Sequence, residues 1–264
     1  MVEKTKALEA YQEAGEDPKA LECIPMLKRS DIKREAAKII NEELTVDDSL
    51  FLYHDVCTNG IGYVDLMFKT DSIAPEQIPY LGLLKSVLGY VDTENYTYGE
   101  LFNEINANTG GINCGVEVFD RADSTEEFQA MFSVRGKALY TKMDFLFKMI
   151  GEILNSSKLE DTKRLYEIVA SVKSRAQVNL TGAGHSTAVL RAAAYSSPMA
   201  AFQDEMAGIG YYQFIEKLEK DFEQRKEETV EELCKLMKKI LRPENFMISY
   251  TGERESLETV QKLA

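Results

Sequence analysis

Apolar residues recur at two different spacings along the chain, and each spacing predicts a different kind of element. In Ser49–Val56 and Ile61–Lys69 they recur at every second position, which is typical of β-strands with one buried face. Phe51 and Tyr53 then share one face of the first strand. The sequence Thr58-Asn59-Gly60 between the two runs favours a turn, so we predict a hairpin.

The stretch from Pro79 to Phe119 predicts two helices and a strand in direct succession. The first helix, Pro79–Gly89, has apolar residues at helical spacing, namely Tyr80, Leu83, Leu84, Val87 and Leu88. A second helix follows a polar corner at 92–95 and ends at Thr109, Gly110 and Gly111. Glycine is favoured where a helix ends and the backbone needs a positive φ. The residues that follow alternate as in a strand, with Ile112, Val116 and Val118 in phase.

The remaining pattern predicts one more paired strand, a series of helices and a last strand. Glu127–Lys137 alternates and is expected to pair with Gly111–Arg121. Helical spacing of apolar residues predicts helices at 137–154, 159–178, 185–195, 198–208, 210–222 and 227–241. Asn245–Tyr250 is the last predicted strand, and it ends at Thr251-Gly252.

The N-terminal residues carry short helical patterns that cannot form a core. Val2–Ala14 and Asp31–Glu43 are predicted helices, and 20–27 is predicted to be a loop interrupted by Pro25. Because they have too few apolar residues to cover each other, we predict a helical arm at residues 1–44 and an α+β domain at residues 45–264. The predicted strands come in hairpins and do not alternate singly with helices. We therefore expect an antiparallel sheet with helices on one face.

Composition narrows the functional classes. The chain has 31 basic and 44 acidic residues and a net charge of −13, which argues against nucleic-acid binding. No apolar run approaches the roughly 20 residues that span a bilayer, so no membrane partner is expected. The four cysteines are far apart and form no C-x-x-C pair, which indicates free thiols in a reducing compartment.

The residues alone provide no complete active site. The two histidines are His54 and His185. His54 and Cys57 would point to opposite faces of a strand, so no metal pair is expected there. His185 lies at a predicted helix start, and we interpret it as a residue that organises this turn rather than as the centre of a new enzyme site. On these grounds the chain would be an interaction or structural module.

Two runs of the sequence carry a family resemblance. They are residues 58–112, beginning TNGIGYVDLMFKTDS, and residues 182–223, beginning GAGHSTAVLRAAAYSS. Both are similar to the pitrilysin/insulinase clan of zinc metallopeptidases, in its presequence-protease (falcilysin-like) branch. The N-terminal arm, ending in ALECIPMLKRSDI, resembles the stretch that joins the two halves of these proteases.

The resemblance implies a longer protease of four related α+β domains, in two halves that enclose a chamber for peptides. Its first domain would carry H-x-x-E-H on a helix, where two histidines bind Zn²⁺ and the glutamate acts as general base. This chain resembles the third domain. When the motif is aligned with Pro79–Gly89, Leu81 and Lys85 occupy the two histidine positions and Leu84 occupies the position of the glutamate. Leucine and a lysine ammonium have no lone pair for zinc, so we expect no catalytic or metal-binding residue.

Two functions follow as alternatives. The first is the non-catalytic third domain of a zinc metallopeptidase that degrades oligopeptides, with residues 1–44 as linker arm and the rest as chamber wall and hinge. Its partners would be the remaining domains and a peptide substrate, contacted at Thr109, Gly110 and Gly111, and zinc would belong to the full-length protein only. The second is a stand-alone binding or assembly module of the same fold without peptidase activity. In both cases this chain alone is expected to be inactive. We expect it in a prokaryotic-type cytoplasm, or in an organelle if a transit peptide precedes the full-length chain.

Overall fold

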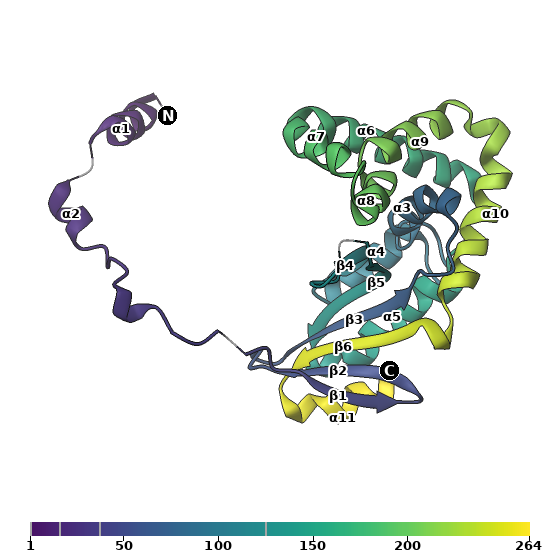
Figure 1. The fold of residues 1–264 in the computed structure, drawn as a ribbon, viewed down its shortest axis with the longest axis horizontal. Helices are drawn as coiled ribbons and strands as arrows, with labels where there is room; N and C mark the ends of the chain where they lie inside the picture. The colour runs from purple at the N-terminus through teal and green to yellow at the C-terminus, as the bar shows by residue number, and fades with distance from the viewer. Residues whose placement is uncertain (1, 16, 37, 125) are drawn as a thin grey trace. The chain divides into compact units, whose positions relative to one another are not determined.

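The computed structural model describes residues 2–15, 17–36, 38–124 and 126–264 (Figure 1). It divides into two units, residues 1–39 and 40–264. The first unit contains α1 (Val2–Glu13), α2 (Pro18–Glu22) and a short 3-10 helix at Arg29–Asp31. Residues 20–22, predicted as loop, belong to α2 because Pro18 fits a first helical turn. All described side chains of this unit are exposed, so its described part has no core.

The helix predicted at Asp31–Glu43 is wrong for the described residues. Residues 32–36 and 38–41 are irregular, strand β1 begins at Glu42, and residue 37 lies outside the described residues. Ile32 and Ile39 have helical spacing but are 59% and 88% exposed. Short helices are marginal in water unless packing buries their apolar face, and nothing buries this one.

In the described residues, six strands form one sheet in the order β1-β2-β6-β3-β5-β4. Their bounds are β1 Glu42–Val46, β2 Ser49–Asp55, β3 Ile61–Lys69, β4 Ile112–Asp120, β5 Phe128–Leu139 and β6 Phe246–Gly252. The predicted pairing of Gly111–Arg121 with Glu127–Lys137 is confirmed by the antiparallel β4 and β5. The α+β class is confirmed too. The sheet is mixed rather than wholly antiparallel, because β2 and β6 run parallel.

The hairpin predicted between the first two strand runs is wrong, because β6 lies between β2 and β3 (Figure 1). Asn59 and Gly60 do have the positive φ values of a turn, 54° and 81°. The chain nevertheless crosses the width of β6 before it enters β3. The hairpin partner of β2 is β1, and Asp47 and Asp48 connect them with φ values of 45° and 66°.

Helices form a layer against the sheet. Their bounds are α3 Ile78–Val87, α4 Tyr98–Asn108, α5 Met143–Ser156, α6 Thr162–Gly182, α7 Gly184–Ala193, α8 Pro198–Ala207, α9 Ile209–Lys220, α10 Phe222–Ile240 and α11 Arg254–Leu263. The helix predicted to start at residue 137 starts at Met143, because β5 stays paired with β3 as far as Leu139. The sequence patterns predict neither β1 nor α11.

Helix α3 occupies the centre of the helical layer. Its residues Leu81, Leu83, Leu84 and Val87 are at most 1% exposed. Figure 1 shows α3 between the sheet and the group of helices α6 to α9. The helix is therefore buried on more sides than the single apolar face that its spacing predicts.

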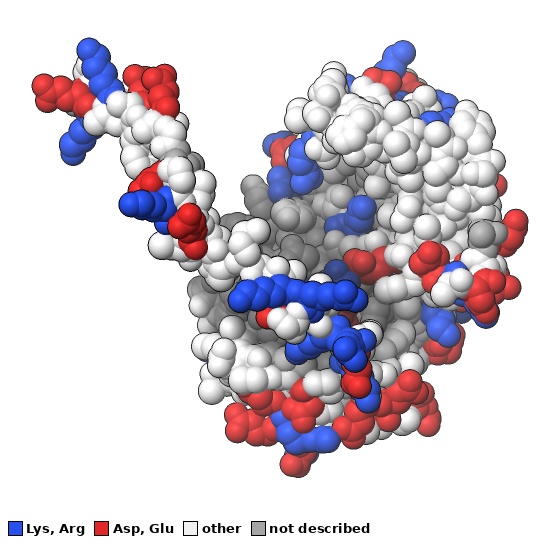
Figure 2. All heavy atoms as spheres, turned by 60° about the vertical axis from the view of Figure 1, so that its left-hand side comes forward, with Lys and Arg blue, Asp and Glu red and all other residues white. Residues whose placement is uncertain are grey.

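The surface carries both acidic and basic side chains. On the face shown in Figure 2, a hollow opens below the helices at the top of the view, with charged side chains on its walls.

Every helix in the described ranges is too short or too polar to cross a membrane.

Candidate functional site

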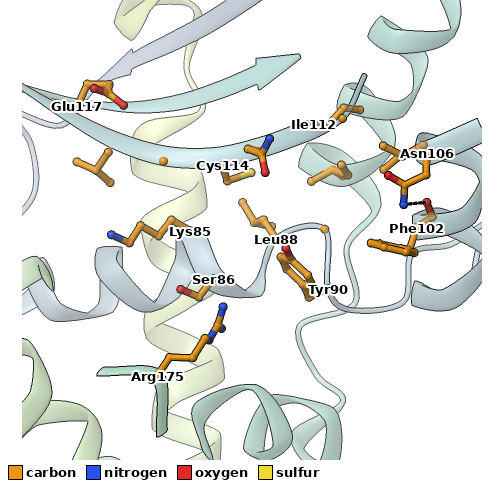
Figure 3. Close-up of a pocket in the computed structure, with 17 residues that line it drawn as sticks. Lys85, Ser86, Leu88, Tyr90, Phe102, Asn106, Ile112, Cys114, Glu117 and Arg175 are labelled. Carbon is orange, nitrogen blue, oxygen red and sulfur yellow. Dashed lines mark hydrogen bonds between the residues drawn. The ribbon is translucent and has the colours of Figure 1, made fainter. Parts of the chain in front are cut away.

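A groove runs along the outer edge of strand β4 (Figure 3). β4 is the last strand in the sheet order, so no other strand of the described part of the chain pairs with this edge. The groove has a volume of about 450 Å³ and lies between Gly111–Glu117, the second half of α3, α4, and Arg175 of α6. We call it the β4 groove. An unpaired strand edge offers backbone N–H and C=O groups with which another chain can pair.

The hydrogen-bond register identifies the groups that β4 offers. The backbone N–H of Lys137 on β5 donates to the carbonyl oxygen of Gly111, at 3.4 Å. In an antiparallel pair, alternate residues point their N–H and C=O to the same side. It follows that Ile112, Cys114 and Val116 direct their backbone groups away from β5 and toward the groove.

The predicted helix end at Thr109, Gly110 and Gly111 is confirmed, and it shapes one end of the groove. Thr109 caps α4, and its Oγ1 donates to the carbonyl of Ile105 at 2.7 Å and accepts from the N–H of Gly111 at 3.0 Å. Gly111 has a φ of 109°, which favours glycine. The N–H of Gly110 donates to the carbonyl of Lys137 at 2.7 Å. Of the three residues, Gly111 lines the β4 groove. Their contact with a peptide stays a prediction.

The other end of the groove is charged. Figure 3 shows Lys85 and Glu117 at this end, and Phe102 and Asn106 at the opposite end. Glu117 forms an ion pair with Arg135 at 3.1 Å. The side chains of Lys85 and Arg175 make no hydrogen bond or ion pair with any described residue. Burial lowers the pKa of Lys85, and the nearby Glu117 partly opposes this shift. The groove therefore holds two cations whose donors remain open to a ligand.

The three positions laid on the zinc motif all lie on α3 and differ in exposure. Leu81 is 0% and Leu84 is 1% exposed in the core, whereas Lys85 lines the groove. Two leucine side chains and a lysine ammonium offer no lone pair to a metal. Among the described residues there is also no cluster of three His, Cys, Asp or Glu side chains that could hold a metal. The residues present do not fit zinc.

Both histidines lie away from the groove. Nδ1 of His54 is 2.7 Å from the carbonyl oxygen of Ile40, and Nε2 is 3.2 Å from Oγ of Ser249. Each ring nitrogen thus has a partner, which leaves His54 with no free lone pair. His185 is the second residue of α7, is exposed, and makes no hydrogen bond with the described residues.

The sequence patterns miss the residues that converge on the groove from distant helices. Lys85 and Arg175 lie on different helices, and no periodicity relates them. One signal is present in the sequence. Neither cation has an acidic residue three or four positions away, whereas exposed helical cations are often paired in this way.

Comparisons with known proteins match almost the whole chain. A family model matches residues 1–218, and its description is that of a region associated with peptidases of family M16, subfamily C. Protein HypA of Clostridium perfringens is 34% identical over 262 residues, which are 99% of this chain and 27% of that protein. Presequence protease 1, chloroplastic/mitochondrial, of Arabidopsis thaliana is 27% identical over 258 residues, which are 98% of this chain and 24% of that protein. This chain therefore spans about a quarter of the length of these curated relatives.

A solved structure supports the fold. The crystal structure of a conserved protein from Enterococcus faecalis V583 aligns with a TM-score of 0.58, over 84% of this chain and 51% of that chain. At 12% sequence identity this likeness concerns the fold alone.

Proposed function

Because the chain belongs to the family of regions associated with subfamily C of the M16 peptidases, we propose that it is the non-catalytic third domain of a zinc metallopeptidase that degrades oligopeptides in a closed chamber. The resemblance found in residues 58–112 and 182–223 is confirmed by this membership and by relatives named presequence protease. In this proposal residues 1–44 are the linker arm and residues 45–264 are the domain. Zinc would be held elsewhere in the full-length protein, because the residues of α3 cannot ligate it.

The observation that carries the proposal is the free edge of β4 inside a groove. A peptide in extended conformation can add to such an edge as a further strand, with backbone hydrogen bonds that do not depend on its sequence. Strand residues rise about 3.4 Å each, so Ile112–Glu117 would accommodate a segment of about 20 Å. Ile112, Cys114 and Val116 would supply the backbone partners, next to the predicted contact residues Thr109, Gly110 and Gly111.

The partners of the full-length protein would cover the N-terminal unit. Its apolar residues Leu8, Tyr11, Leu27 and Ile39 are between 54% and 88% exposed. Burying such side chains is favourable at about 25 cal/mol per Å² of apolar surface. We infer that the remaining protease domains pack on this unit. A cytoplasmic location fits the bacterial relative, and an organelle fits the plant relative.

Strand addition can be tested with N-methylated peptides. A labelled hexapeptide is titrated with the protein in two forms, methylated either at its odd or at its even backbone nitrogens. In an added strand, one set of backbone N–H groups faces β4 and the other set faces solvent. The peptide methylated on the set that faces β4 should bind about tenfold or more weakly than the other form, since each lost hydrogen bond removes about 0.5–1.5 kcal/mol. Equal weakening of both forms would contradict strand addition.

The absence of catalysis has its own test. The chain is incubated with a quenched fluorogenic peptide, with and without added Zn²⁺. We expect no cleavage in either condition, because no zinc ligand set is present in the described residues. Turnover that a chelator abolishes would overturn the non-catalytic assignment.

A stand-alone binding or assembly module is the second candidate. Residues 40–264 have their own hydrophobic core, which favours a domain that folds without further domains. The coding sequence on either side decides between the two. An in-frame domain with H-x-x-E-H favours the protease, and stop codons directly next to this segment favour the module.

A further inference from the structure

A second, smaller cavity adjoins the charged end of the β4 groove. It has a volume of about 240 Å³ and shares Ser86 of α3 and Arg175 of α6 with the groove. Tyr211 of α9 also lines it. Three helices that are far apart in the sequence thus bring a guanidinium and two hydroxyl groups to one place.

Tyr211 is unusual in this group because its hydroxyl is buried and has no partner among the described residues. The residue is 5% exposed. Its ring lies against Gly82, one turn before Ser86, where an added Cβ would meet a ring carbon at 2.8 Å. Burial raises the pKa of Tyr211, and the nearby Ser86 and Arg175 partly oppose this rise. Buried hydroxyl groups normally have a partner, so an unpartnered one at a cavity wall points to a ligand that supplies the acceptor.

The other two members are also free to bind. Ser86 Oγ donates to the carbonyl of Gly82 over 3.3 Å, a long bond that can be exchanged. The side chain of Arg175 makes no ion pair or hydrogen bond with the described residues, and that of Lys85, next to Ser86, makes none either. Glu117, the acid that opposes the pKa shift of Lys85, already pairs with Arg135 at 3.1 Å. The local charge is positive, although the chain as a whole has a net charge of −13.

We propose that Arg175, Tyr211 and Ser86 form a subsite for a carboxylate carried by a peptide that lies along β4. The subsite rests on the proposed peptide groove and gives it a chemical preference. A carboxylate oxygen accepts from the guanidinium and from both hydroxyls, and the ammonium of Lys85 adds attraction. The carboxylate is either the C-terminus of the peptide or an acidic side chain near that end.

Three labelled peptides of one neutral, apolar sequence test the preference by fluorescence anisotropy. The first has a free C-terminus, the second a C-terminal amide, and the third the amide with a glutamate as its last residue. We expect the amide peptide to bind about tenfold or more weakly than the first, because hydrogen bonds to a charged group are stronger than those to a neutral one. Recovery of affinity in the third peptide shows that an acidic side chain can replace the C-terminal carboxylate, and no recovery restricts the subsite to the C-terminus.

Matched variants locate the subsite. Tyr211→Phe removes the hydroxyl, and Arg175→Gln removes the charge from an exposed side chain. Both should reduce the preference for the free carboxylate and leave the affinity for the amide peptide unchanged. Tyr212→Phe on the same helix and Arg242→Gln at the end of α10 are the controls, and both should keep the preference. Thermal unfolding of each variant verifies that it is folded.

The outcomes separate the two proposals. Equal affinity for all three peptides, combined with an effect of N-methylation on one face, overturns the carboxylate subsite and leaves the groove intact. A carboxylate preference that survives both Tyr211→Phe and Arg175→Gln also overturns the subsite. No binding of any peptide overturns the groove and the subsite together.

Discussion

Replacing Leu84 by Glu would place a carboxylate at a position of α3 that is 1% exposed. The change loses the burial of an apolar side chain, about 1.5–3 kcal/mol. A fully buried carboxyl has its pKa raised by up to 3–5 units, and above that pKa the ionised form costs about 4–7 kcal/mol. The sum is similar to the whole stability of a typical domain, about 5–15 kcal/mol. We therefore expect Leu84→Glu to unfold the protein, or nearly so, at pH 8.

The pH dependence distinguishes this cause from a loss of packing alone. A raised folded-state pKa means that the folded state binds more protons than the unfolded state. Stability is then retained below the unfolded pKa of about 4.3 and falls by about 1.4 kcal/mol per pH unit until the folded pKa is reached. Urea unfolding at about pH 6 and about pH 8 should show Leu84→Glu losing stability over this interval, relative to the unmodified chain.

Lys85→Glu is the matched control, because it introduces the same side chain one position later, in the groove. It should cost only about 1–2 kcal/mol, through repulsion from Glu117. Equal tolerance of glutamate at 84 and 85 would refute the placement of Leu84 in the core.

Three further substitutions test the scaffold around the groove. Gly82→Ala should lower the free energy of unfolding, measured in urea, by about 1–3 kcal/mol, because its Cβ would lie 2.5 Å from the carbonyl oxygen of Met206. Gly99→Ala is the control, and it should be neutral or stabilising because the space around Gly99 is open. Asp204→Asn should cost about 2 kcal/mol, because this 1% exposed carboxylate accepts from Arg191 and from the backbone at the start of α9; a loss below about 0.5 kcal/mol would contradict this role. The hydroxyl of Tyr140 and backbone N–H groups lower the pKa of Glu253 to about 2. The stabilisation of the folded state by the ionised Glu253 carboxylate is therefore complete above about pH 4.3 and is lost toward pH 2. The Tm difference between the unmodified chain and Glu253→Gln should therefore narrow between about pH 5 and pH 3, and a constant difference would contradict the shift.

Local patterns predicted the elements whose formation depends on neighbours in the sequence. The alternation of Ile61–Lys69 and the glycine at position 111 identified a strand and a helix end, because period and backbone freedom are local properties. The place of β6 between β2 and β3 is not local. It brings the ring of Tyr250 to 6.1 Å from the ring of Tyr53 and 6.4 Å from that of Phe51. Such contacts between distant residues leave no periodic signal in either segment.

The candidate site was predictable only in part, for the same reason. Thr109, Gly110 and Gly111 were found because they change the chain direction. Arg175 and Tyr211 were missed, because each appears in the sequence as an ordinary helical residue. Arg175 lies on the outer side of α6, and Tyr211 on the buried side of α9. Only the packing of α6 and α9 against α3 brings these side chains to one cavity.

The same packing disfavours a metal ligand at position 82 of α3. A shift of the zinc motif by one residue gives Gly82, Lys85 and Ser86, and the latter two line the groove. Because Gly82 has no side chain, the ring of Tyr211 occupies the space that the Cβ of a metal-ligating residue would need. A histidine at 82 would therefore collide with Tyr211 and with the backbone of Met206, while Lys85 supplies a cation in place of a base. The positions toward the groove are thus suited to hold an anion, as the proposed carboxylate subsite requires.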